Sequence, residues 1–413
     1  PVQAVVILDH PIIGLSSAAL EFQVEAADAP PAPETIQVTN RGGGVLSNLS
    51  TMILYPDSGG WLSAGLAGTA APTELLVQPD PSGLSPGTYM AEVRVSGREA
   101  INTPLSLDVT LTVKIGPVSP AHSTGSVPRG TSGEPTIIVV QARDKGGNPV
   151  SSGGATVLVT VSGANAAGPI TATDAGDGTY TASYTPTVAG PDSVAITMDG
   201  TPISDSRFTS TVAAGAASPA HSTANVPDGT VNLPTAIVVQ ARDGSGNPVR
   251  SGGATVLVTV SGANAAGPIT ATDAGDGTYT ASYTPTVAGT DSVAITMDGT
   301  PISDSPFTST VAAGAASPAH STATVPDGVR KELTEIVVQA RDAHGNPVTV
   351  GGETVVVTVT GTNDTGPITA TDVGDGTYTA SYRPHPVRTG LDYVAITMNG
   401  TPISGSPYVS TVR

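Results

Sequence analysis

Three acidic turns come closest in this chain to metal chemistry. Each reads Asp-X-Gly-Asp-Gly, and the paired carboxylates are Asp174 and Asp177, Asp273 and Asp276, and Asp372 and Asp375. Carboxylates between glycines can hold Ca²⁺, which takes about six to eight oxygen ligands. Asp side chains also accept N–H bonds inside tight turns. Two carboxylates fall short of a full ligand set, so we expect turn stabilisation, with calcium as the alternative and no other cofactor.

A histidine also recurs, as His122, His221 and His320, each 99 residues from the last. A histidine at a joint between modules can act as a pH-sensitive contact. No second His or Cys recurs beside it to complete a metal site. Ordinary packing at the joint is therefore the favoured interpretation, and a pH-sensitive contact is the alternative.

Adjacent Arg and Asp residues form the third recurring group, Arg143–Asp144, Arg242–Asp243 and Arg341–Asp342. Neighbours on a strand point to opposite faces. These residues are therefore expected to be separate surface charges or turn caps, and not a binding pair.

Catalytic constellations do not stand out. The sequence shows no Gly-x-Ser-x-Gly elbow, phosphate-binding loop, His-Glu-x-x-His pair or separated Ser/His/Asp set, and it has no cysteine. The three lysines, Lys114, Lys145 and Lys331, share no position of the repeat, which excludes a Lys–Asn crosslink in every copy. The chain is not expected to be an enzyme.

Net charge and hydropathy narrow the partners. The formal charge is −18, and an acidic surface repels phosphate backbones, so nucleic acid is excluded as the expected partner. No apolar run approaches the ~20 residues of a membrane-spanning helix, so membrane insertion is not expected either.

The elements that must position these residues are repeated. The segment SPAHST opens at Ser119, Ser218 and Ser317, and a fixed period of domain length indicates an array of small folded modules. We predict one N-terminal domain followed by three repeats, arranged as an elongated rod. The expected bounds are 1–116, 117–215, 216–314 and 315–413.

Within each repeat, short apolar runs alternate with Gly, Asn and Pro turns. This pattern predicts about seven strands per repeat, all-β architecture and a two-sheet sandwich. In the first repeat the expected strands are Thr136–Asp144, Ala155–Gly163, Ile170–Asp174, Thr179–Pro186, Ser193–Gly200 and Phe208–Val212, with a short one near His122. In the N-terminal domain the expected strands are Leu20–Val24, Glu34–Asn40, Gly87–Gly97 and Leu105–Ile115.

Three motifs carry family resemblances. The stretch from Asp174 to Phe208, with its GDGTY turn and closing GTPIS, resembles filamin-type immunoglobulin-like repeats. Ile237–Val249 resembles the bacterial Ig-like repeats of invasins and intimins. The N-terminal domain resembles BACON-like modules, with Trp61 at the position of the family's core tryptophan. These resemblances imply tandem Ig-like sandwiches, found in adhesins, surface stalks, phage fibres and enzyme accessory regions, and the BACON likeness implies carbohydrate or mucin binding.

We therefore predict a non-enzymatic extracellular structural or adhesive protein, at the surface of a cell or a virion. Its modules would be spacers and contact surfaces in a surface filament, a virion fibre or a decoration protein. Self-association or docking on a larger assembly, or a glycan or cell-surface ligand, would supply its partners. The alternative is a carbohydrate-binding module array or the accessory region of a larger secreted enzyme.

The opening segment Pro1–Ile13 is the most suggestive interaction element. Its apolar residues are Val2, Val5, Ile7 and Ile12. It is either the first strand of the N-terminal domain or a strand that adds to the sheet edge of a neighbouring subunit.

Deleting Pro1–Ile13 tests the second interpretation. If the segment adds to a neighbour's sheet, the shortened chain loses its assemblies, because the unpaired edge loses its partner. Light scattering of the full and shortened chains at equal concentration measures this, and unchanged assembly would remove the idea.

Overall fold

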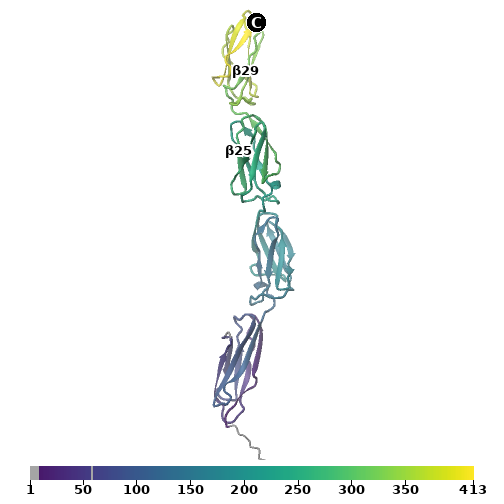
Figure 1. Ribbon diagram of the computed structural model, residues 1–413, viewed down its shortest axis with the longest axis vertical. Helices are drawn as coiled ribbons and strands as arrows, with labels where there is room; N and C mark the ends of the chain where they lie inside the picture. The colour runs from purple at the N-terminus through teal and green to yellow at the C-terminus, as the bar shows by residue number, and fades with distance from the viewer. Residues whose placement is uncertain (1–8, 57–58) are drawn as a thin grey trace, which may run out of the picture. The chain divides into compact units, whose positions relative to one another are not determined.

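The structure is a computed structural model, and it describes residues 9–56 and 59–413. Strands dominate it, and the helices of these residues are two single turns of three residues each (Figure 1). None of the described residues forms a helix long and apolar enough to cross a membrane. The chain divides into two compact units, Pro1–Ala213 and Ala214–Arg413, which hold four hydrophobic cores between them.

The N-terminal domain packs two four-stranded sheets, ordered β1-β3-β6-β5 and β2-β8-β7-β4. Strands β2 and β8 are parallel, and the other pairs are antiparallel. The strands are β1 (Ile13–Leu15), β2 (Ala19–Glu25), β3 (Glu34–Asn40), β4 (Ser47–Leu54), β5 (Leu62–Leu66), β6 (Thr73–Pro79), β7 (Gly87–Arg98) and β8 (Leu105–Lys114).

The first repeat pairs a sheet ordered β14-β15-β11-β9 with one ordered β10-β18-β16-β12-β13, to which β17 adds through β16. Its elements are η1 (Pro120–His122), β9 (Thr124–Ser126), β10 (Gly130–Thr131), β11 (Thr136–Gln141), β12 (Val157–Gly163), β13 (Ala167–Thr171), β14 (Thr173–Asp174), β15 (Thr179–Tyr184), β16 (Gly190–Met198), β17 (Thr201–Pro202) and β18 (Phe208–Ala213).

The second repeat has the same order, β19-β21-β25-β24 and β20-β28-β26-β22-β23, with β27 on β26. Its elements are η2 (Pro219–His221), β19 (Thr223–Asn225), β20 (Gly229–Thr230), β21 (Thr235–Gln240), β22 (Val256–Gly262), β23 (Ala266–Thr270), β24 (Thr272–Asp273), β25 (Thr278–Tyr283), β26 (Gly289–Met297), β27 (Thr300–Pro301) and β28 (Phe307–Ala312).

The third repeat keeps both sheets, β29-β30-β34-β33 and β32-β31-β35-β36, with β37 on β35. Its strand β32 has two residues where β13 and β23 have five. Its strands are β29 (Thr322–Thr324), β30 (Thr334–Gln339), β31 (Val355–Gly361), β32 (Ile368–Thr369), β33 (Thr371–Asp372), β34 (Thr377–Tyr382), β35 (Gly390–Met398), β36 (Thr401–Pro402) and β37 (Tyr408–Val412).

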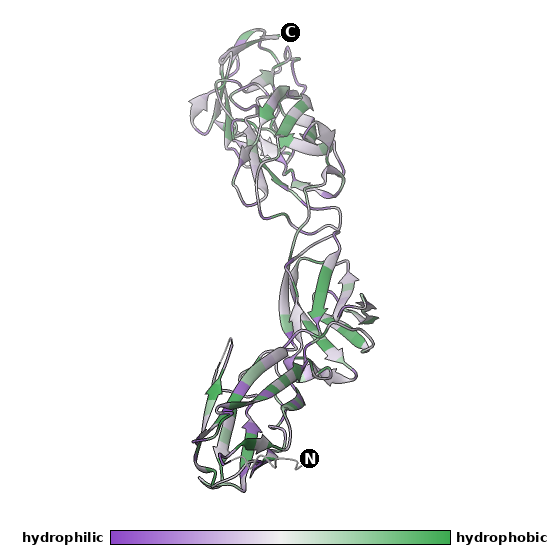
Figure 2. Ribbon diagram, turned by 60° about the horizontal axis from the view of Figure 1, so that its bottom comes forward, coloured by the Kyte–Doolittle hydropathy of each residue, from purple (hydrophilic) through white to green (hydrophobic). Residues whose placement is uncertain are grey.

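Side chains alternate between the core and solvent along every long strand. On β11, Ile138 and Val140 are buried. The alternate residues Ile137 and Val139 face solvent, with 57% and 39% of their surface exposed. Successive strand residues face opposite sides of a sheet, so one face of each sheet supplies the aliphatic interior. Figure 2 shows the strongest hydrophobic colour on strand ribbons of this kind.

The strand predictions are confirmed in type, and their bounds shift. The predicted strand Ile170–Asp174 is two strands, β13 and β14, which belong to different sheets. Short strands such as β10 and β17 raise the number in the first repeat from the expected seven to ten. Sequence patterning missed these because strands of two residues are too short to show an alternation.

The matched pair Ile237 and Val238 tests this alternation. Ile237→Ala removes a side chain with 0% exposure at the centre of β21, and should lower the free energy of unfolding of the second repeat by about 2–5 kcal/mol. Val238→Ala, at a position 38% exposed on the other face, should cost less than about 1 kcal/mol. Urea unfolding of the full chain measures both, and equal losses would contradict the predicted orientation of the strand.

Candidate functional site

The acidic turns bind their own backbone. Asp174 accepts the amide N–H of Gly154 at 2.7 Å with Oδ2 and that of Gly176 at 2.8 Å with Oδ1. Asp177 accepts the amide N–H of Thr179 at 2.9 Å. The second and third repeats make the same bonds. The described residues hold no cluster of three or more His, Cys, Asp or Glu side chains suited to a metal, and these oxygens stabilise turns.

A glycine fixes the shape of this turn. Gly178 has φ of 84°, a conformation that side chains rarely adopt, and a Cβ at this position would lie 1.9 Å from the carbonyl oxygen of Val150. This close approach places the turn against the preceding loop. The last glycine of the GDG sequence is therefore required for steric reasons in every repeat.

A buried carboxylate holds the chain at the entry of each repeat. Asp243 is 1% exposed, and it accepts the amide N–H of Gly215, in the connecting segment, at 2.8 Å. It also accepts the amides of Ser245 and Asn247 and the side-chain amide of Asn247. Asp144 binds Gly116 and Asn148 in the same way, and Asp342 binds Gly314 and Asn346. We call these three residues the joint aspartates.

The hydrogen bonds at the joint aspartates outweigh their burial. Burial by itself raises the pKa of Asp243, whereas the bonds from Asn247, Gly215 and Ser245 favour the charged form and lower the pKa to about 2. The pKa values of Asp144 and Asp342 are lowered by the same balance. The carboxylate therefore stays ionised at neutral pH and serves as a fixed acceptor for the connecting backbone.

The predicted Arg–Asp groups are turn caps, as one of the two expectations had it. Arg143 donates to the carbonyl of Gly147 at 2.8 Å, in the turn that Asp144 also bonds through Asn148. The expectation of a surface charge is wrong for Asp144, because four hydrogen bonds from Gly116 and Asn148 compensate for its burial. The Asp-x-x-x-Asn spacing, as in Asp144 and Asn148, was the sequence signal that could have identified the cap.

A second buried carboxylate lies inside each sandwich. Asp192 is 1% exposed and accepts from the Tyr184 hydroxyl at 3.0 Å, and from the backbone and side-chain amides of Asn165. Burial, and then the Asp192 carboxylate, raise the pKa of the Tyr184 hydroxyl, against a bond from Ser210 that lowers it. The Asn165 carbonyl accepts the amides of Thr187 and Val188. A Tyr–Asp pair can do proton chemistry, but this one is enclosed and braces the loops around it.

The recurring histidines lie on the surface of their turns. His122, His221 and His320 are exposed, and the Nδ1 atom of His122 lies 2.9 Å from the hydroxyl of Ser119. The other two make the same contact with Ser218 and Ser317. Each ring contacts the start of its own turn, and both interpretations of the joint histidines, ordinary packing and a pH-sensitive contact, stay predictions.

The joint between the second and third repeats has direct contacts. Asn346 donates to the carbonyl of Thr286 at 2.9 Å and accepts the amide of Ala288 at 3.0 Å. The same Asn346 binds Asp342, so the joint aspartate orients the residue that touches the preceding module.

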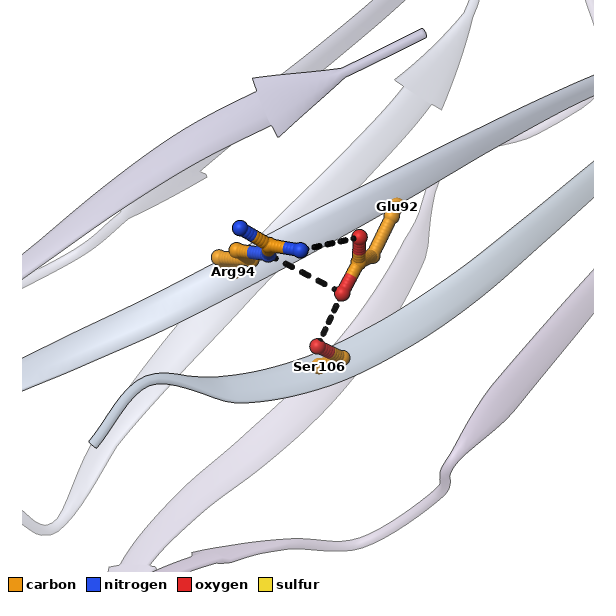
Figure 3. A network of polar contacts seen from close by, with 3 residues as sticks. All are labelled: Glu92, Arg94 and Ser106. Atoms are coloured by element: carbon orange, nitrogen blue, oxygen red, sulfur yellow. Dashed lines mark hydrogen bonds and ion pairs between the residues drawn. The ribbon is translucent and has the colours of Figure 1, made fainter. Parts of the chain in front are cut away.

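The N-terminal domain has its own polar network and groove. Arg94 donates twice to Glu92 at 3.0 Å, and Ser106 donates to the same carboxylate (Figure 3). The bonds from Arg94, and then Ser106, lower the pKa of Glu92. A groove of about 460 Å³ beside it is lined by Leu54, Tyr55, Pro56, Met90, Ala91, Glu92, Asp108, Val109 and Thr110.

Trp61 lies in the core of this domain and not in a sugar-binding platform. It is 3% exposed, and its ring packs edge-on against Tyr55 at 6.0 Å and tilted against Tyr89 at 6.4 Å. Its indole N–H has no hydrogen-bond partner among the residues that the structure describes.

The proposed added strand is only partly within the described residues. Val2, Val5 and Ile7 lie outside them. Ile12 is half-buried, and it bonds Asn40 and Arg41 of its own domain, next to β1. The start of this segment therefore stays a prediction, whereas its end belongs to the first sheet.

Each module packs two sheets around its own aliphatic core and caps its turns with carboxylates. These features define a tandem array of immunoglobulin-like modules. The filamin/ABP280 repeat model matches residues 117–209, 216–308 and 315–409, and the chain belongs to this family. The predicted filamin-type repeats are confirmed. The match does not include residues 1–116, for which the BACON-like resemblance stays a prediction.

Individual proteins similar to the chain include a filamin. Filamin-C of Rattus norvegicus is 32% identical over 243 residues, which cover 56% of this chain and 8% of that protein. The chain thus spans less than a tenth of the length of the curated relatives that it matches. Solved structures with similarity include the Escherichia coli adhesin FdeC, at 28% identity and a TM-score of 0.48, covering 72% of this chain and 99% of that one. Yersinia pseudotuberculosis InvD has 20% identity and a TM-score of 0.40, with 71% and 98% covered.

The joint aspartate of the second repeat gives a prediction with a defined pH range. Its pKa falls from 3.8 in the unfolded chain to about 2 in the folded one, so its ionised form stabilises the fold above about pH 4, by about 2 kcal/mol. That contribution is lost as the pH falls toward 2. Asp243→Asn should therefore lower the free energy of unfolding at pH 7 and make little difference at pH 2.

Urea unfolding at both pH values measures this difference, and hydrogen exchange at the Gly215 amide reports the joint itself. Asp276→Asn, in an exposed turn, is the control, and it should change stability less than Asp243→Asn does and leave the exchange of the Gly215 amide unchanged. An Asp243→Asn deficit of equal size at pH 2 would contradict the assignment.

Proposed function

We propose that this chain is a non-enzymatic extracellular protein with a structural or adhesive role, at the surface of a cell or a virion. The observation that carries the proposal is the use of its reactive groups. In each repeat the joint aspartate, the inner Asp–Tyr pair and the turn carboxylates bind the protein's own backbone and side chains. The carboxylates of the modules therefore stabilise the same fold in all three copies.

The outer surfaces fit a role as spacers and contact surfaces. The three repeats share their inward residues. The first two also share most outward residues, since residues 152–190 are identical to 251–289, whereas the third repeat differs at exposed positions such as Tyr393 and Val409 and so presents another surface on the same scaffold. Membership of the filamin repeat family supports a structural role for the modules. We propose that the chain is part of a surface filament, a virion fibre or a decoration protein, and that it acts through self-association or docking.

The alternative, carbohydrate binding by the N-terminal domain, rests on the groove beside Tyr55 and Met90. Tyr55 is half-buried, and its hydroxyl bonds the carbonyl of Leu62, so little of the ring is open to stack on a sugar. A glycan-array signal abolished by Met90→Ala, at a position 59% exposed, would favour this alternative.

Immunogold labelling of the source organism tests the proposal. Antibody against the purified chain should label intact cells, cell-attached filaments or virions, because the modules are proposed to work outside the cytoplasm. Antibody absorbed with the purified chain is the control. Label that appears only after permeabilisation would overturn the extracellular role.

A further inference from the structure

One face of the third repeat is apolar at positions that are polar in the second repeat and mostly polar in the first. Leu391, Tyr393 and Val409 point outward from β35 and β37, with 47%, 45% and 54% of their surface exposed. We call these three residues the third-repeat face. The matching positions are Thr290, Ser292 and Thr308 in the second repeat, and Pro191, Ser193 and Thr209 in the first.

The interior does not require this change. The inward residues of the same two strands are identical in the second and third repeats, and they are Asp392, Val394, Ile396, Met398, Ser410 and Val412 against Asp291, Val293, Ile295, Met297, Ser309 and Val311. Because these apolar side chains lie outside the core, they add no core packing to the stability of the repeat. They are typical of surfaces that become covered by a partner.

The three side chains form one continuous surface. Tyr393 lies directly across from Val409 in the antiparallel pair of β35 and β37, and Thr360 of β31 lies on its other side. Residues opposite each other have Cβ atoms about 4.5–5.5 Å apart, within contact of a tyrosine ring. Leu391 lies two residues along β35 on the same face.

Two arginines lie at one end of this face. Arg388 comes just before β35, and Arg413 just after β37, and the pairing of Gly390 with Val412 brings these ends together. Arg388 donates to the carbonyl of Thr362 at 3.2 Å. Arg413 pairs with Asp327 at 3.0 Å, and it is the only one of the two with an ion pair in the described part of the chain.

Three more cations extend this basic end. Arg330 donates its amide to the carbonyl of Arg413, the Lys331 amide donates to Pro384, and Arg383 donates to the carbonyl of Lys331. All five cationic side chains are exposed, with Glu332 and Asp327 as their acidic neighbours. The second repeat has Val231, Asn232 and Thr284 at the positions of Arg330, Lys331 and Arg383.

We propose that the third-repeat face docks an acidic protein, whose apolar side chains cover Tyr393 and Val409 while its carboxylates meet Arg388 and its cationic neighbours. The inference rests on the proposed adhesive role and names the partner chemistry. Tyrosine and arginine are the residues that most often carry binding energy at protein interfaces.

Other occupants fit the face less well. Two copies of it would bring like charges together, which costs free energy. A sulfated glycan or a nucleic acid needs the cations but not the apolar centre. The charge of −18 on the whole chain acts against every anionic partner, so the local basic end must supply the attraction, and the vesicle arm of the test below separates a membrane surface from a protein.

A random copolymer of glutamate and tyrosine is the probe, and the full chain immobilised on a biosensor is the receptor. Poly-glutamate, heparin and phosphatidylserine vesicles are the comparison ligands. The triple variant Leu391→Thr, Tyr393→Ser and Val409→Thr carries the residues of the second repeat, which folds with them. It should weaken copolymer binding by about tenfold or more.

Two further variants separate charge from apolar contact. Arg388→Gln with Arg383→Gln should weaken binding and flatten its salt dependence, because fewer charges are screened. The reciprocal variant Thr290→Leu, Ser292→Tyr and Thr308→Val places the apolar residues on the second repeat, without the basic end, and should add no comparable binding.

Tighter binding of the copolymer than of poly-glutamate, lost in the triple variant, supports the proposal. Equal binding of both polymers, a copolymer affinity unchanged by the triple variant, binding of heparin or vesicles alone, or no binding of any ligand would each overturn it. The binding assay and the immunogold labelling are independent measurements. Failure of the proposed docking surface can therefore be distinguished from failure of the proposed extracellular role.

Discussion

The narrow interior between two sheets is the constraint on which the rest of each repeat depends. Val194, Ile196 and Met198 are fully buried on β16, and the same three residue types recur on β26 and β35. Close packing penalises any change of volume there, so the inward residues stay fixed across the copies. The outward residues of the same strands meet only solvent. The strand period of two thus separates the inward residues, which stabilise the module, from the outward residues, which form its surface. A single scaffold can therefore carry different surfaces.

The polar interior follows from the same logic. A carboxylate taken out of water is costly unless hydrogen bonds replace its hydration. Asp243 receives bonds from Gly215, Ser245 and Asn247, and its pKa is therefore lowered although burial acts to raise it. These bonds tie the connecting backbone to the module that follows, so the connector is a hydrogen-bonded part of the repeat. Groups that would be reactive in an open cleft are used here as fixed acceptors.

Much of this architecture was predictable, and the failures have physical causes. Alternation predicted β3 at Glu34–Asn40 and the buried faces of Tyr180 and Val194, because burial of one sheet face leaves a direct trace in the sequence. The burial of Asp144 was not predicted, because a carboxylate is an expected surface residue until its donors are known. Those donors include Gly116, 28 residues earlier in the chain, so only the folded chain brings them together.

The sequence by itself determined the repeat period, the all-β class and the family, because each rests on residue types at fixed spacing. Tertiary structure decided which of the substitutions that distinguish the third repeat lie together on its surface. Leu391, Tyr393 and Val409 are separated by up to 18 positions and look like scattered changes in the third copy. Pairing of β35 with β37 places them side by side on one exposed face, next to Arg388. Strand register is set by packing and hydrogen bonds across the sheet, and it is this register that turns isolated substitutions into a surface.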